Sequence, residues 1–257
     1  MGTSGAYTGS GGKIGKDLRD GIEDFLGAPP GAPPGPPSGP PDPTDRRPLP
    51  PINPAVFRAA LQLLRPGTGG GGGGDGPGGA GGARGGGGPQ RTAAAAAGSA
   101  GRAAAAAHAY TTGDAAALDA LGLDFAELQA LDDDFEVVRR IVASACGTPD
   151  STIDDSEQRW VAAGVAEWII ENEQNNPEAI VRQTIAAIIT QTVLVESGDL
   201  INHHPDAVRA EHDIRDAAEA LAAKAQLSVG GTSEQEIAHA VEEGLNILRE
   251  ILGGPDA

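Results

Sequence analysis

The chain has 257 residues, of which 36 are Asp or Glu and 18 are Lys or Arg, giving a net charge of −18 at pH 7. Its one cysteine, Cys146, excludes an intramolecular disulfide. Residues 1–91 hold 27 of the 39 glycines and 16 of the 20 prolines. Because such a segment cannot bury enough apolar surface to offset its ordering entropy, we expect a flexible tail over residues 1–91 and one acidic α-helical domain over residues 92–253.

The acidic residues gather in the predicted domain. Residues 1–91 carry nine Lys or Arg and seven Asp or Glu, whereas residues 92–257 carry nine and 29. Phosphate backbones are bound mainly through positive charge, so the composition disfavours direct nucleic-acid binding and suits a basic protein partner. Acidic helix faces that only keep the domain in solution would produce the same pattern.

The sequence predicts no membrane segment and a cytoplasmic location. Its first residues lack the basic and apolar regions of a secretory leader. The most apolar run, residues 177–196, contains Glu178, Arg182 and Glu196, which argue against a membrane span. The lone cysteine suits a reducing compartment.

Two short amphipathic segments interrupt the predicted tail. At residues 14–26 the apolar side chains recur at helical spacing, namely Ile14, Leu18, Ile22, Phe25 and Leu26. We expect this segment to order on a partner or against the body, the alternative being a tail that stays disordered. A second short helix is expected over residues 54–64, between a Pro-rich spacer at 28–51 and a glycine tether at 67–88.

The domain begins with alanine-rich residues 93–110, which predict one or two small-residue helices interrupted near Gly98 and Gly101. Short helical segments are expected at residues 114–121 and 124–131, the second capped by an aspartate.

Two longer helices should follow. Residues 135–146 present apolar side chains at helical spacing. Ser151 or Thr152 can cap the next helix, in which Trp160 and Trp168 lie eight residues apart and so share a face.

Residues 177–196, PEAIVRQTIAAIITQTVLVE, predict the central helix of the fold. Asn176 suits the N-cap, Pro177 suits the first helical position, and Gly198 can close the C-terminus. Apolar side chains lie on more than one side of this helix, so we expect other helices to cover it from several directions.

The last two helices are expected over residues 206–227 and after a capping box formed by Ser233 and Glu236. No stretch shows the two-residue alternation of a half-buried strand. The sequence therefore predicts an all-α helical bundle that follows a long Gly/Pro-rich tail.

The motifs that would indicate a phosphate-binding loop or a metal site are incomplete in this sequence. The glycine-rich residues 9–17 lack the Ser or Thr and the preceding strand of a phosphate-binding loop. His203, His204 and His212 could be imagined as a metal site, but Pro205 interrupts the helix that would align them, so a loop cluster fits better.

The remaining titratable candidates also have structural explanations. His108 and His239 have no recognisable partner, and no pattern joins Cys146 to a base. The acids within residues 153–157 are expected at a helix N-terminus because of its dipole. We therefore predict no catalytic residue, no metal site and no cofactor, and we predict that the protein is not an enzyme.

The N-terminus offers one reactive group. A small second residue favours removal of Met1, which would leave the Gly2 α-amine on an open leader. An α-amine has a pKa of about 7.7–8.0, so a neutral, nucleophilic fraction exists near pH 7. Myristoylation is disfavoured because Ala6 stands where Ser or Thr is required.

Several short motifs stand out along the chain, namely Met1-Gly2-Thr3-Ser4, the Gly/Pro spacer, Gly101-Arg102-Ala103 to Tyr110, Thr112-Gly113-Asp114, Leu121-Gly122-Leu123-Asp124 and Ser151-Thr152-Ile153-Asp154. Together they resemble those of QatB-like components of Qat-type anti-phage defence systems. The resemblance covers the N-terminal tetrapeptide and, loosely, residues 92–252. It implies a small, non-enzymatic defence component.

The same resemblance implies partners: a QueC-like enzyme related to 7-cyano-7-deazaguanine synthases, an ATPase and a TatD-like nuclease. The chain would then be a substrate or scaffold, and the QueC-like partner would attach a deazaguanine-type group to Gly2 through an amide. The partner-binding residues would be Met1, Gly2, Thr3, Ser4, Ile14, Leu18, Ile22 and Phe25.

Two other functions fit the sequence. The chain could be a structural or assembly protein whose helical body oligomerises or docks an ATPase, with the tail as a passive tether. A third reading is a helical protein associated with secretion or with a toxin. Only the modification hypothesis needs the Gly2 amine.

Overall fold

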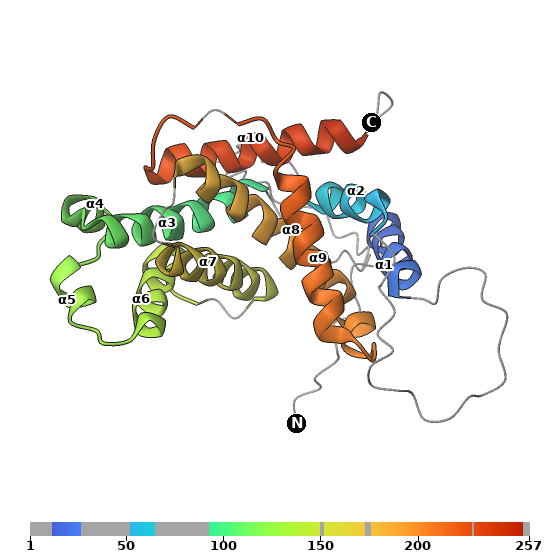
Figure 1. Cartoon of the computed structure of the whole chain (residues 1–257), viewed down its shortest axis with the longest axis horizontal. Helices are drawn as coiled ribbons and strands as arrows, with labels where there is room; N and C mark the ends of the chain where they lie inside the picture. Colours follow the sequence, from blue (N-terminus) through green and yellow to red (C-terminus); the bar gives the residue numbers. More distant parts are fainter. Residues whose placement is uncertain are drawn as a thin grey trace, which may run out of the picture.

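The computed structural model describes residues 12–26, 52–64, 93–149, 152–172, 176–227 and 229–253. Within these ranges the chain forms ten α-helices and no β-strand, which confirms the predicted all-α class (Figure 1). The Pro-rich spacer and the glycine tether lie outside the described residues. The helices are α1 (Lys13–Leu26), α2 (Pro54–Leu63), α3 (Ala93–Thr112), α4 (Ala115–Ala120), α5 (Phe125–Gln129), α6 (Asp134–Cys146), α7 (Ile153–Glu171), α8 (Pro177–Asn202), α9 (Ala207–Ala222) and α10 (Glu234–Gly253).

The predicted central helix, α8, runs through the middle of the molecule and contacts α1, α2, α3, α7, α9 and α10 (Figure 1). This confirms the expectation that helices cover it from several directions. By length and composition α8 could cross a bilayer, with a mean hydropathy of 1.3 over its most apolar window, but 61% of that window is buried inside the fold. Its apolar faces are the ones that form the core.

Apolar side chains gather in two clusters that α8 joins. The larger core contains the N-terminal half of α8 with α3, α6, α7 and α10. The smaller core contains α1, part of α2, and the C-terminal half of α8, which contributes Val193 and Ile201. The residues of α9 divide between the two cores, with Ile214 in the smaller one and Leu221 in the larger one.

Of the one or two helices predicted for this segment, a single continuous helix, α3, forms, and Gly98 and Gly101 do not interrupt it. Its alanines are buried on nearly every side, and α3 packs against both α7 and α10. Such small side chains let neighbouring helices approach closely, and that packing offsets the low helix propensity of glycine. Ser99 stays inside the helix because its hydroxyl donates to the carbonyl of Ala95 at 3.2 Å.

Several predicted helix starts are confirmed by their hydrogen bonds. Asn176 accepts from the Ala179 amide at 2.8 Å at the start of α8. Thr152 accepts from the Asp155 amide at 3.1 Å at the start of α7. The capping box before α10 is also present, with Ser233 and Glu236 bonded to each other.

Two predicted helix ends are wrong. Helix α8 does not end at Gly198 but continues to Asn202, because Ser197 and Ile201 are buried in the next turn and their packing outweighs the glycine. The helix predicted over residues 206–227 ends at Ala222. Asp206 stands at its N-cap position but makes no side-chain cap hydrogen bond.

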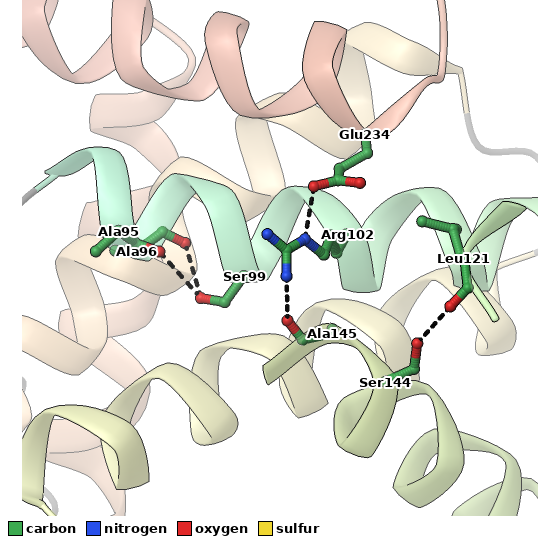
Figure 2. A network of polar contacts seen from close by, with 8 residues as sticks. All are labelled: Ala95, Ala96, Ser99, Arg102, Leu121, Ser144, Ala145 and Glu234. Atoms are coloured by element: carbon green, nitrogen blue, oxygen red, sulfur yellow. Dashed lines mark hydrogen bonds and ion pairs between the residues drawn. The ribbon is translucent and has the colours of Figure 1, made fainter. Parts of the chain in front are cut away.

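Arg102 joins three helices at the end of the larger core (Figure 2). From α3, its Nε donates to Glu234 at 2.6 Å at the start of α10, and its Nη1 donates to the Ala145 carbonyl at 3.3 Å near the end of α6. Nearby, the Ser144 hydroxyl donates to the Leu121 carbonyl at 2.7 Å. These bonds satisfy carbonyls that the ends of α6 and α4 would otherwise leave unpaired.

Arg249 of α10 performs a similar role for α2. Its guanidinium donates to the carbonyls of Leu61, at 3.2 Å from Nε, and Leu64, which lie at the C-terminal end of α2. A third bond goes to Asn246 at 2.6 Å. Burial lowers the pKa of Arg249, but guanidinium groups remain protonated in proteins, so the donors are permanent.

Replacing Arg249 by methionine is expected to lower the free energy of unfolding by about 1–3 kcal/mol, because buried carbonyls of α2 lose a charged donor. Chemical denaturation followed by circular dichroism measures the change. Arg139→Met is the matched control, since Arg139 pairs with Glu136 on the exposed face of α6 and such exposed pairs contribute little to stability. Equal effects of the two changes would contradict this role of Arg249.

Candidate functional site

The predicted modification and partner-binding residues divide into two groups. Met1, Gly2, Thr3 and Ser4 lie outside the described residues. The others lie on α1, where Leu18 and Ile22 are fully buried and Phe25 is 3% exposed, while Ile14 packs at the edge of the smaller core. In the structure these four side chains face the body of the same chain, and their predicted role toward a partner stays a prediction.

Helix α1 packs on α2 and on the C-terminal half of α8, which contributes Val193 and Ile201. We call this surface and the neighbouring His204 the α1 seat. Gly21 makes the close approach to α2 feasible, since a Cβ at this position would lie 2.7 Å from Cγ2 of Val56. Arg19 adds an ion pair, with its Nη2 at 2.9 Å from Oδ2 of Asp199 on α8. Burial and charge therefore both hold α1 in place.

The end of α1 is fixed by a histidine. Nε2 of His204 lies 3.1 Å from the Leu26 carbonyl oxygen, and Nδ1 of His204 accepts from the Asp206 amide at 3.1 Å. Because an accepting Nδ1 carries no proton, this tautomer places its proton on Nε2, which donates to the Leu26 carbonyl. The neutral imidazole thus satisfies one of the free carbonyls at the C-terminus of α1.

The three histidines weighed as metal ligands are not brought together. His203 contacts the Asp199 carbonyl with its Nδ1 at 2.5 Å, His204 faces α1, and His212 lies 3.6 Å from Asp216. No group of three or more His, Cys, Asp or Glu side chains within the described ranges could hold a metal ion. As expected, His203 and His204 belong to the turn between α8 and α9.

Burial shifts the pKa of two other titratable residues, His108 and Cys146. Burial lowers the pKa of His108 on α3, opposed by the nearby carboxylate of Asp114. Burial also raises the pKa of the Cys146 thiol, which disfavours the thiolate and so makes this cysteine a weak nucleophile.

The acidic start of α7 behaves as a helix N-terminus. Asp155 pairs with Arg159 one turn later, with 2.9 Å between Oδ2 and Nε. Glu157 is buried, with 6% of its side chain exposed. The side chains of residues 153 and 154 lie outside what the structure describes.

The residues that position α1 could not be identified from sequence. Arg19 and Asp199 are 180 positions apart, and an ion pair at that separation leaves no local pattern. Clustering of titratable residues, the one signal that the sequence offers here, points to His204 only as a candidate metal ligand. The periodic apolar face of residues 14–26 was the one usable sign that this segment packs.

In the described part of the chain, α1 thus packs firmly on the body. The modification site predicted from sequence lies among the residues before α1. The body is acidic, with nine basic and 29 acidic residues over residues 92–257. Comparisons of the chain with models of known families, with curated proteins and with solved structures find no match.

Proposed function

We propose that the chain is a non-enzymatic component of an anti-phage defence system, in which a QueC-like partner modifies the N-terminal Gly2. The neutral α-amine of Gly2 attacks an activated carboxyl carbon of a deazaguanine-type group. A C–N bond forms, the bond from that carbon to its activating group breaks, and the amine releases a proton. The support for this chemistry is the resemblance of the Met1–Ser4 tetrapeptide and of residues 92–252 to QatB-like proteins.

The structural observation that best supports a role in presenting Gly2 to an enzyme is the α1 seat. Leu18 and Ile22 are fully buried there, and Arg19 pairs with Asp199 at 2.9 Å. Helix α1 therefore begins at a fixed point on the body. Gly2 precedes Gly12 by ten residues, and a fully extended chain spans at most about 3.3–3.6 Å per residue, so Gly2 stays within roughly 36 Å of that point. An enzyme that acts on Gly2 must bind within that distance of α1.

The test is the intact mass and the N-terminal peptide mass of the protein, purified from cells with and without a QueC-like enzyme encoded beside it. We expect an added mass on Gly2 only when that enzyme is present. Gly2→Pro removes the primary amine and should abolish the addition, whereas Gly5→Pro leaves the amine intact and serves as the matched control.

An unmodified Gly2 under both conditions, including during infection, would refute the modification proposal. The chain would then be an assembly protein that acts through its helical body. That alternative predicts a stable complex with an ATPase, or a defined oligomer, that forms equally well with Gly2→Pro. Sedimentation of the purified proteins distinguishes the two functions.

A further inference from the structure

A groove of about 390 Å³ lies between α7, α8 and α9. On α7 it is lined by residues at helical spacing, including Trp160, Gly164, Trp168 and Glu171. The facing side of α8 contributes small and amide side chains, and α9 contributes Arg215 and Glu219. The predicted common face of the two tryptophans is confirmed, but part of that face is open to solvent.

Trp160 makes this groove unusual. The chain has two tryptophans, both line the groove, and 69% of Trp160 is exposed. The wall beside it is made of small residues, Ala163 and Gly164 on α7 and Ala186 and Ala187 on α8. A Cβ placed at Gly164 would meet nothing within 4 Å, so there is free space above the helix backbone. An exposed tryptophan beside an open space is typical of a surface that binds another molecule.

The charged residues of the groove are mainly acidic. Glu167, Glu171 and Glu219 line it, and their carboxylates make no ion pair or hydrogen bond within the described ranges. Elsewhere on the same helices acids are paired, as in Glu178 with Arg182, and Asp213 with Arg209 at 3.8 Å. The groove therefore holds three carboxylates without ion pairs and one guanidinium, that of Arg215.

One buried hydroxyl at the groove is also unsatisfied. Helix α8 has three buried threonines, and two of them, Thr184 and Thr192, donate to the carbonyl four residues earlier at 2.8 Å. The third, Thr190, lines the groove, is 7% exposed and has no hydrogen-bond partner for its Oγ1. Buried polar groups are normally paired, so this hydroxyl is a second sign that a polar ligand group completes the site.

We propose that this groove binds an arginine-containing segment of a partner protein. A guanidinium stacks on an exposed tryptophan face, donates to carboxylates in pairs and gives up its hydration more readily than an ammonium. The acidic residues exclude a phosphate-bearing ligand by repulsion. A second copy of the chain is disfavoured, because it would place two strongly acidic bodies against each other. The proposal does not depend on the modification of Gly2.

Tryptophan fluorescence provides a direct readout, because both tryptophans lie in the groove. The probe is a synthetic amphipathic peptide of about 12 residues with arginine and leucine at helical spacing, long enough to follow α7 at 1.5 Å per residue from Trp160 to Glu171. We expect this peptide to quench or shift the emission in a saturable way and to bind more weakly as salt increases. The same peptide with glutamate in place of arginine should not bind. Trp168→Phe leaves Trp160 as the sole reporter.

Two variants test the location. Gly164→Leu fills the open space with a side chain and should weaken peptide binding by at least about tenfold. Gly98→Leu is its matched control, since a Cβ at Gly98 on α3 also meets nothing within 4 Å but lies outside the groove. Glu167→Gln should weaken binding and reduce its salt dependence, whereas Glu250→Gln, on α10, should do neither.

Three results would overturn the proposal. One is no saturable change with the arginine peptide, and another is equal binding of the glutamate peptide or of the Gly164→Leu variant. The third is a tryptophan signal that changes with protein concentration alone, together with a dimer in sedimentation. That last result would show that a second copy occupies the groove.

Discussion

Replacing Gly101 by alanine is expected to lower the free energy of unfolding by about 1–3 kcal/mol, and Gly101→Leu by more, because α3 and α10 have no room for the added atoms. A Cβ at Gly101 would lie 2.9 Å from Cβ, 3.0 Å from the backbone nitrogen and 3.1 Å from Cα of Ala238. Backbone atoms of a buried helix cannot move aside as a flexible side chain would. The two helices would have to separate, and the larger core would open along α3.

The matched control for this prediction is Gly98→Ala on the same helix. Since Gly98 has nothing within 4 Å of its Cβ position, alanine should raise stability there by about 0.5–1 kcal/mol through its higher helix propensity. Urea denaturation of the two variants measures the difference. Stabilisation by both alanines would show that α3 and α10 are not in close contact, and would contradict the packing described here.

Ile22→Ala is expected to have the second large effect, a loss of about 2–5 kcal/mol of local stability at the α1 seat. Ile22 is fully buried in the smaller core, and its removal leaves a cavity between α1 and its neighbours. Amide hydrogen exchange should rise strongly across α1 while the amides of α3 remain protected, because the two helices belong to different cores.

Asp20→Ala is the control for this change, since Asp20 lies on the exposed side of α1. It should leave the exchange of α1 within about 0.5 kcal/mol of the original. A uniform increase of exchange across the whole chain with Ile22→Ala would mean that the cores unfold together. The variant also bears on the proposed function, because a partner that requires the fixed start of α1 should modify Gly2 less efficiently when α1 is released.

Local signals predicted most of the fold. Apolar periodicity located the long helices, and side-chain caps such as Asn176 and Thr152 marked their starts, because both features act over one or two turns. Gly198 indicates a helix end that the structure does not have, because tertiary packing continues α8 beyond it. Gly98 and Gly101 likewise indicate a break that α3 does not have, because small residues there allow contacts with helices remote in sequence.

The sites were less predictable than the fold. The pairing of Arg19 with Asp199 depends on which helix packs beside α1, which no local pattern encodes. For the groove, spacing predicted that Trp160 and Trp168 share a face, and an exposed tryptophan at that face could not be foreseen. A helix face becomes buried or open according to the neighbours that other segments supply, so the exposure of Trp160 is a property of the whole fold.

The continuity of α8 sets an order of dependence between the two cores. Its N-terminal half belongs to the larger core, and its last three turns, together with α2, form the surface on which α1 lies. The larger core can therefore assemble while α1 is still detached, whereas the surface for α1 is incomplete until α8 has formed. Maturation of the chain should accordingly be hierarchical, with capture of the N-terminal helix as its final, separately reversible step.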